Sequence, residues 1–133
     1  MRLVLWAICS CLFGAEDWHP LKVIATAYCP CSLCCGVRAV GITADGTDVS
    51  EVSYGVAVDP RQIPYGTSLH IPTGEGYLDN QRPDDRIFPA DDTGGIIRRR
   101  TRSTGVIHID LRFRRHSSAV KFGIKPMTIW IWK

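Results

Sequence analysis

The stretch Gly105-Val-Ile-His-Ile-Asp-Leu-Arg-Phe113 has the clearest two-residue alternation in the chain. Successive side chains of a β-strand point to opposite sides, so this pattern predicts a strand with one apolar and one polar face. The two faces carry Ile107, Ile109, Leu111 and Phe113 on one side and Val106, His108, Asp110, Arg112 and Arg114 on the other. The strand would therefore hold Asp110 on its polar face, with His108 beside it.

Other short stretches rich in β-branched and aromatic residues, bounded by turn residues, predict further strands at 22–28, 54–58, 68–72 and 127–133. The segment 73–89 is mostly polar and predicts a loop. The segment 116–123 ends in a glycine and predicts one short helix. In a chain of 133 residues this spacing indicates a single all-β domain, a small barrel with one short helix.

Composition and charge restrict the function. Hydrophobic content of 45% and charged content of 22% are those of a globular protein. Nine of the twelve arginines lie between Arg82 and Arg115, and the run Arg98-Arg99-Arg100 predicts a basic loop that could face an acidic polymer. No basic helix or aromatic-interleaved motif favours nucleic acid, so we do not expect a nucleic-acid partner.

The N-terminus has the pattern of an export signal. One arginine precedes an apolar run from Leu3 to Phe13, which suits a signal peptide and is too short to span a bilayer. We expect a signal peptide at 1–15, a mature domain at 16–133, no membrane span, and a protein that is secreted or resides in the periplasm or cell envelope, including the outer membrane. Cys11 loosely resembles a lipoprotein acceptor cysteine, so a lipid anchor is one alternative. A buried N-terminal strand is another.

Four cysteines lie within seven residues: Cys29, Cys31, Cys34 and Cys35. In an exported protein they could form two short disulfides. A zinc site is the competing interpretation, but structural zinc sites usually draw ligand pairs from two separated segments, and the sequence shows no second pair. We therefore favour disulfides and expect no metal.

The stretch Ala90-Asp-Asp-Thr-Gly-Gly95 places two carboxylates beside a hydroxyl and two glycines. Such residues form ordinary solvated turns, but paired glycines also allow positive φ or close approach of another group. Asp59 ends one predicted strand, and Asp110 lies on the polar face of another. Carboxylates that meet raise the pKa of at least one member, and a carboxyl that keeps its proton suits glycosidic-bond cleavage. Clustered carboxylates also bind Mg²⁺ or Ca²⁺, but no loop has EF-hand spacing.

Several spaced motifs occur in a characteristic order. They are Ala25-Thr-Ala-Tyr-Cys-Pro-Cys31, Cys34-Cys-Gly36, Gly41-Ile-Thr-Ala44, Gly55-Val-Ala-Val-Asp-Pro60, Ile63-Pro-Tyr-Gly-Thr67, Asp92-Thr-Gly-Gly95 and Ile109-Asp-Leu111. Together they resemble the 3D domain, named for three aspartates, of bacterial cell-wall proteins, over residues 22–133. The resemblance implies a six-stranded double-psi β-barrel related to the catalytic barrel of MltA-type lytic transglycosylases. It maps the three aspartates to Asp59, Asp92 and Asp110, with Asp91 a less suited neighbour.

The implied activity is cleavage of the MurNAc–GlcNAc bond of peptidoglycan with formation of a 1,6-anhydro ring, without metal or cofactor. One aspartic acid acts first as acid and then as base. We expect Asp92 in that role, with Asp110 tuning its pKa or steadying charge at C1 and Asp59 in support. Residues of the matching motifs are expected to bind the glycan, with Arg98 beside them: Thr26, Tyr28, Thr43, Thr93, Gly94, Gly95 and Arg98. The alternatives are a non-catalytic wall-binding module on the same barrel and, behind it, a metal or redox protein built on the cysteine loop.

The chain departs from the family pattern between its second and third aspartates. These lie 18 positions apart, where relatives have a short segment that carries a lysine. Here Ile96-Ile97-Arg98 replaces that segment, and Arg98 could supply the missing charge, although arginine and lysine are not interchangeable.

Overall fold

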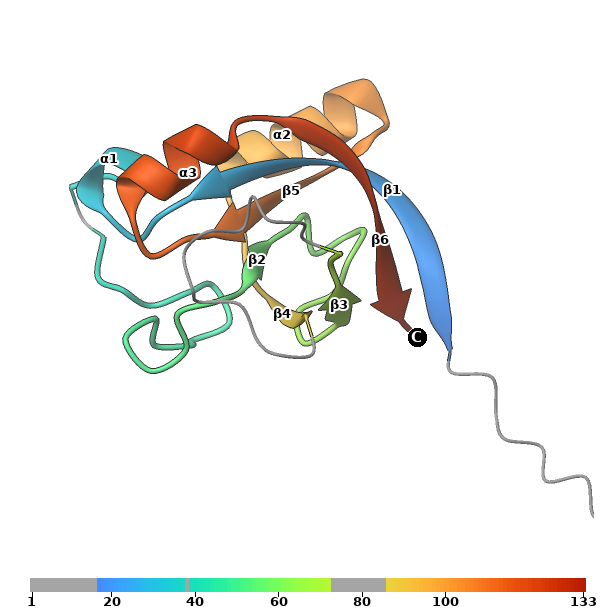
Figure 1. The fold of residues 1–133 in the computed structure, drawn as a ribbon, viewed down its shortest axis with the longest axis horizontal. Helices are drawn as coiled ribbons and strands as arrows, with labels where there is room; N and C mark the ends of the chain where they lie inside the picture. The colour runs from blue at the N-terminus through green and yellow to red at the C-terminus, as the bar shows by residue number, and fades with distance from the viewer. Residues whose placement is uncertain (1–16, 38, 73–85) are drawn as a thin grey trace, which may run out of the picture.

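The computed structural model describes residues 17–37, 39–72 and 86–133. The predicted signal peptide at 1–15, Cys11 and most of the predicted loop at 73–89 lie outside the described residues. The described part contains six strands and three helices (Figure 1), which are β1 Trp18–Tyr28, α1 Ser32–Cys35, β2 Val56–Ala57, β3 Ser68–His70, β4 Ile87–Asp92, α2 Gly95–Thr104, β5 Ile107–Arg112, α3 His116–Phe122 and β6 Lys125–Trp132. Among the described helices, none has the length and apolar character needed to cross a bilayer.

The six strands close into a ring in the order β1-β5-β2-β4-β3-β6. Two neighbouring pairs, β1–β5 and β2–β4, are parallel, and the other four are antiparallel. The long strand β1 joins two partners, since its first part pairs with β6 and its last part with β5. The prediction of a mostly β domain is confirmed, and closure gives each described strand a neighbour on both sides.

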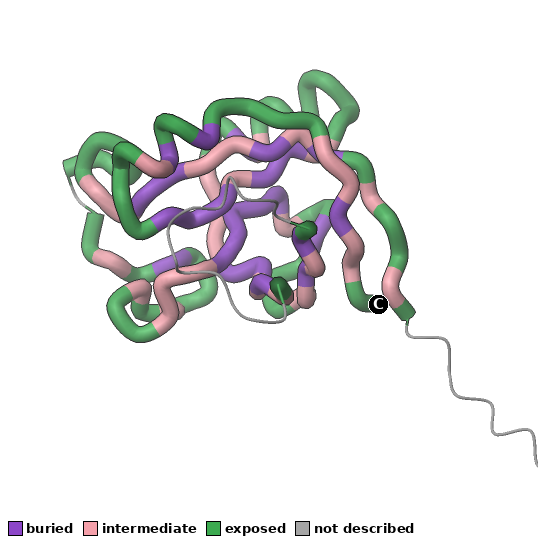
Figure 2. Tube along the Cα trace, in the orientation of Figure 1, coloured by how far each residue is buried: buried purple, intermediate pink, exposed green. Residues whose placement is uncertain are grey.

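The core fills the inside of this ring, where buried segments face one another (Figure 2). The predicted apolar face of β5 is part of it, since Ile109, Leu111 and the following Phe113 are fully buried. Each fully buried aliphatic or aromatic side chain contributes about 1.5–3 kcal/mol relative to its exposed state. The same cluster includes Val23, Ala25, Val56, Val58, Ile63, Leu69, Ile71, Phe88, Ala90 and Ile129.

The acidic stretch predicted as a turn is the end of a strand. Strand β4 runs from Ile87 to Asp92 and pairs with β2 on one side and β3 on the other. Proline and aspartate are poor strand formers, but burial of Phe88 and Ala90 outweighs that local preference. Neither glycine after the strand uses positive φ, because Gly94 is extended at φ −148° and Gly95 begins α2.

The expectation of one short helix was wrong, because the described residues contain three. Helix α3 lies where the sequence predicted it, at 116–122, and Gly123 follows with φ 70°. The predicted basic loop is helix α2, which ends at the left-handed Gly105. Arginine is a good helix former, and α2 buries Ile97 and Thr101, one turn apart, towards β5. The cysteine segment contains the third helix, α1.

The polar face of β5 is also buried in part, which the alternation did not predict. Arg112 is fully buried, and its guanidinium forms two hydrogen bonds with the Asp91 carboxylate, at 2.9 Å and 2.7 Å. Burial lowers the pKa of Arg112, but its interactions with Asp91 and Tyr28 together raise this pKa by a larger amount. The pKa of Arg112 therefore lies above its usual value, and the side chain remains a cation. The same guanidinium donates to the carbonyl of Tyr54 at 2.7 Å.

Gly55 makes room for this ion pair. A Cβ atom at Gly55 would lie 2.5 and 2.6 Å from the two Asp91 carboxylate oxygens and would also overlap the Arg112 guanidinium. Both side chains are fixed by several hydrogen bonds, so neither can move aside at low cost. The glycine is therefore required by close packing, not by its backbone conformation, since its φ is not positive.

We predict that Gly55→Ala lowers the free energy of unfolding by roughly 3 kcal/mol, through overpacking and distortion of the buried ion pair. Urea unfolding followed by tryptophan fluorescence measures this change. Gly95→Ala is the matched control, because a Cβ there meets nothing within 4 Å, and a change within about 0.5 kcal/mol is expected. Equal stability of Gly55→Ala and the wild type would contradict the packing argument.

Candidate functional site

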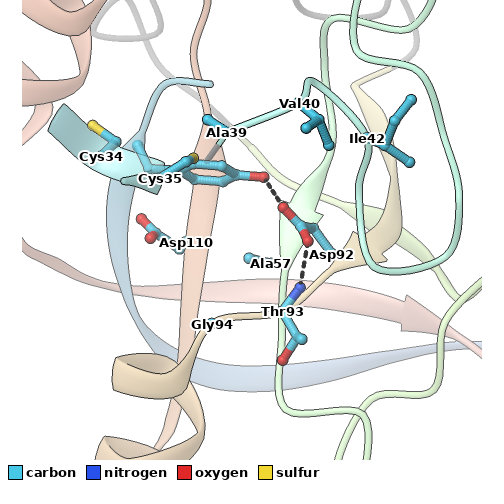
Figure 3. Close-up of a pocket in the computed structure, with 11 residues that line it drawn as sticks. Cys34, Cys35, Ala39, Val40, Ile42, Ala57, Asp92, Thr93, Gly94 and Asp110 are labelled. Carbon is cyan, nitrogen blue, oxygen red and sulfur yellow. Dashed lines mark hydrogen bonds between the residues drawn. The ribbon is translucent and has the colours of Figure 1, made fainter. Parts of the chain in front are cut away.

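An open cavity of about 410 Å³ lies where the ends of β1, β4 and β5 meet the segments that carry the cysteines and residues 39–42. It brings together Asp92 from β4 and Asp110 from β5, with Ala57 of β2 beneath them (Figure 3). The remaining lining residues are Tyr28, Cys34, Cys35, Ala39, Val40, Ile42, Thr93 and Gly94. Two of the three predicted aspartates therefore share one cavity.

Asp92 accepts hydrogen bonds from three donors. The Tyr28 hydroxyl donates to Oδ2 at 2.7 Å, and the backbone N–H groups of Ala44 and Thr93 donate to Oδ1 at 3.0 Å and 2.9 Å. These donors come from three separate segments of the chain. The carboxylate is therefore fixed in orientation, with both oxygens acting as acceptors.

The turn that carries Ala44 is itself attached to β4. The Thr43 hydroxyl donates to Asp45 Oδ1 at 2.7 Å and accepts from the Thr47 backbone N–H at 3.0 Å. The Asp45 backbone N–H donates to the Asp91 carbonyl at 3.1 Å. Thr43 thus positions the Ala44 N–H towards Asp92, and it lines a smaller adjoining cavity of about 50 Å³ that shares Tyr28 and Asp92 with the first.

Asp110 has a different environment. Its described hydrogen bond is from the Thr26 hydroxyl to Oδ1 at 2.9 Å, across the parallel β1–β5 pair. Burial raises the pKa of Asp110 to about 6, and the nearby charge of Asp92 adds to the rise, while the Thr26 bond and Arg100 oppose it. Near neutral pH a part of the Asp110 carboxyl groups therefore keeps its proton.

Tyr28 connects the cavity to the buried ion pair. Its hydroxyl accepts a hydrogen bond from Arg112 Nη1 at 3.3 Å and donates to Asp92. Burial raises the pKa of Tyr28 well above its usual value, so the phenol keeps its proton and remains a donor. The two adjacent aspartates thus receive hydrogen bonds from one network, Asp91 from Arg112 and Asp92 from Tyr28.

The structure places Asp59 outside this cavity. It lies just beyond β2, is buried, and accepts from the Arg61 backbone N–H at 3.1 Å. Its Oδ2 atom faces Arg102 Nε of α2 at 3.5 Å and lacks a hydrogen-bond partner among the described residues. These contacts are those of a residue that holds a turn against α2.

Three of the seven predicted glycan-binding residues line the cavity, and the other four lie around it. Tyr28, Thr93 and Gly94 line the cavity, whereas Thr26 and Thr43 hold Asp110 and the 43–47 turn. Gly95 begins α2 outside the lining. The Thr93 hydroxyl is already engaged, since it donates to the Val58 carbonyl at 2.7 Å and accepts from Arg98 at 3.2 Å. The binding roles of all seven residues stay predictions.

Sequence reasoning missed the residues that support the aspartates. Arg112 was assigned only to the polar face of β5, and its partner Asp91 lies on β4, on the far side of β2, so spacing along the chain does not link the two residues. The wall formed by Ala39, Val40 and Ile42 was missed too. Within the described residues, three or more metal-binding side chains come within range of one ion at the cysteine loop and not at the aspartates.

Comparison with known proteins gives two matches. A family model described as "3D domain" matches residues 54–133 of this chain. The chain is also 33% identical over 112 residues to the "Putative cell wall shaping protein YabE" of Bacillus subtilis. That alignment covers 84% of this chain but 22% of the relative, so the chain spans about a fifth of that protein.

We predict that the two adjacent aspartates differ sharply in their effect on stability. Asp91→Asn leaves the buried Arg112 charge without its partner and is expected to cost about 3–5 kcal/mol of unfolding free energy. Asp92→Asn keeps an acceptor oxygen at the cavity surface and is expected to cost about 1 kcal/mol or less. Urea unfolding of both variants tests this, and equal costs would contradict the division of roles.

Proposed function

The chain belongs to the 3D-domain family, and on that premise we propose that it is a lytic transglycosylase that cleaves the MurNAc–GlcNAc bonds of peptidoglycan. The family and the cell-wall relative support a peptidoglycan-related function. The observation that carries the proposed chemistry is that Asp110 and Asp92 share one open cavity. Asp110 has a carboxyl group with a raised pKa, and Asp92 has a carboxylate held in one orientation. No metal or cofactor is required.

Asp110 is the better candidate for proton transfer, in place of the Asp92 that the sequence favoured. A general acid must hold a proton near the working pH, and the pKa of about 6 at Asp110 meets that condition. The Asp92 carboxylate accepts three hydrogen bonds that hold it in one orientation, which suits it to stabilise the positive charge that develops at C1. Asp59 supports the fold around the β2 end and does not act in the cavity.

The proposed reaction balances without water. The Asp110 carboxyl donates its proton to the glycosidic oxygen, the bond from that oxygen to C1 of MurNAc breaks, and GlcNAc leaves with a 4-hydroxyl. Asp92 stabilises the positive charge that develops at C1. The Asp110 carboxylate then takes the proton of the muramyl 6-hydroxyl, and that oxygen bonds to C1 to close the 1,6-anhydro ring. Asp110 ends protonated, as it began.

The arginines of α2 give the cavity a basic neighbour. The helix starts two residues after Thr93, and Arg99 and Arg100 are exposed on it. The charge of Arg100 reaches Asp110, where it opposes the rise in pKa that burial causes. We propose that this basic face attracts the anionic stem peptides of peptidoglycan towards the cavity.

The finer description of the fold is also a proposal. Two parallel pairs, β1–β5 and β2–β4, within one closed ring of six strands support the double-psi topology. A peptidoglycan substrate further places the protein outside the cytoplasm. The apolar run at 3–13 would then act as a signal peptide, with release or lipidation at Cys11 as its two outcomes.

We predict that the purified domain releases muropeptides with 1,6-anhydroMurNAc ends from isolated peptidoglycan, as detected by mass spectrometry. Asp110→Asn is expected to lower the rate about 100-fold or more, since it removes the general acid and base. Asp48→Asn is the matched control, because Asp48 is exposed and its side chain bonds only Ser50 among the described contacts. Reducing ends instead of anhydro ends would indicate a hydrolase. Binding of glycan without products would indicate a wall-binding module.

We predict that kcat/KM falls about tenfold per pH unit above pH 6, because the general acid must be protonated. Thr26→Val removes a bond that lowers the pKa of Asp110, so the descending limb should move to higher pH. Asp92→Asn removes a charge that raises this pKa, so the limb should move to lower pH. Thr26→Ser keeps the hydroxyl and should leave the profile in place. Profiles that do not move in either variant would exclude Asp110 as the titrating acid.

A further inference from the structure

Four potential metal ligands meet where β1 runs into α1. They are the Sγ atoms of Cys29, Cys31 and Cys34 and a ring nitrogen of His116, and these atoms all lie within 4.8 Å of one another. All four cysteines of the described chain are free thiols. His116 lies more than 80 residues away in sequence, which is why the sequence pattern offered no fourth ligand.

The distances suit a tetrahedral ion. His116 Nδ1 lies 3.6 Å from Cys29 Sγ and 3.5 Å from both Cys31 Sγ and Cys34 Sγ. Zn–S bonds of about 2.3 Å and Zn–N bonds of about 2.0 Å in a tetrahedron place ligand atoms about 3.5–3.8 Å apart. The Cys29–Cys34 pair, at 3.5 Å, is near this range, while the Cys29–Cys31 pair, at 2.7 Å, must open by about 1 Å around an ion.

The fold places the ligands from two sides. The backbone N–H groups of Cys34 and Cys35 donate to the Cys31 carbonyl at 3.2 Å and 2.8 Å, and this single helical turn brings the Cys34 thiol back towards Cys29. His116 is the first residue of α3, which packs against β1. In Figure 1, α1 and α3 lie side by side at the same end of the molecule.

The fourth cysteine is not part of this group. The Cys35 thiol donates to the Cys29 carbonyl at 3.3 Å and lines the cavity beside Asp110 (Figure 3). The sequence argued against a zinc site because it shows no second ligand pair in a separate segment, but the fold brings His116 of α3 to the loop. Three thiols come from the loop, and the fourth ligand comes from α3.

We propose that Cys29, Cys31, Cys34 and His116 bind a structural Zn²⁺ ion. Soft thiolate ligands with one imidazole in a tetrahedral arrangement select zinc among common divalent ions. Four protein ligands leave no open position, so the ion is structural and not catalytic. Three thiolates, one neutral imidazole and Zn²⁺ give a site of net charge −1, beside the basic neighbours Arg114 and Arg115.

The position of the site gives it a defined consequence. The ion would tie the end of β1, directly after Tyr28, to the start of α3. Tyr28 holds Asp92, and Cys34 lies in the cavity wall. Zinc would therefore stabilise one wall of the cavity without touching the aspartates.

The test measures metal directly and does not depend on enzymatic activity. The full mature domain is purified under reducing conditions, equilibrated with zinc, desalted and analysed for zinc per chain. We expect about one equivalent. Cobalt replacement should give thiolate-to-cobalt charge-transfer bands and the visible bands of a tetrahedral site.

His116→Ala and Cys34→Ser should each weaken zinc binding by at least about 100-fold, since even loss of a group that only hydrogen-bonds to a metal ligand costs about 10–100-fold. Cys35→Ser is the matched control and should bind zinc as the wild type does. Absence of zinc from the reduced, folded wild type would overturn the proposal, as would a disulfide among these cysteines whose reduction yields no metal binding. Equal affinity of His116→Ala and the wild type would exclude His116 as a ligand.

Discussion

The buried ion pair between Arg112 and Asp91 is the interaction on which the site depends. It joins β5 to β4, the two strands that carry Asp110 and Asp92, across the two-residue strand β2. The short β2 forms few ladder bonds, and the Arg112 guanidinium satisfies the carbonyls of Val52, Ser53 and Tyr54 that precede it. A buried pair of this kind adds little net stability compared with an apolar pair. Breaking it is costly, so it fixes how the strands approach one another.

Strand geometry explains why two neighbouring aspartates have different surroundings. Alternation along β4 points Asp91 into the protein and Asp92 into the cavity. The register between β2 and β4 shifts between Val56 and Ala57, which pair with Ala90 and Asp92. A slip of β4 by one residue would exchange the positions of Asp91 and Asp92 and place Asp92 against Arg112. The ion pair and the shifted register therefore both place Asp91 against Arg112 and Asp92 in the cavity.

Much of the fold could be predicted from local patterns, and the failures have physical causes. Alternation found β5, whose Ile109 and Leu111 are buried on one face, and β-branched runs found β1 and β6. Strand β4 was missed because its proline and aspartates are poor strand formers, and the burial of Phe88 and Ala90 that outweighs them depends on neighbouring strands. Helix α2 was missed because an arginine run was taken for a solvated loop. At the site, motif order indicated Asp92 and Asp110. Arg112, the Ala44 N–H and the approach of His116 to the cysteines depend on contacts between distant segments, which spacing along the chain does not encode.

Closure of the ring by β6 affects how the chain can fold. Strand β6 pairs with β1 along eight positions and also with β3, so the ring cannot close until β6 joins both strands. Contacts over such sequence separations slow folding, because a long loop must be closed before they form. Until β6 forms, the edges of β1 and β3 with which it pairs remain open. Docking of β6 therefore protects two strand edges at once.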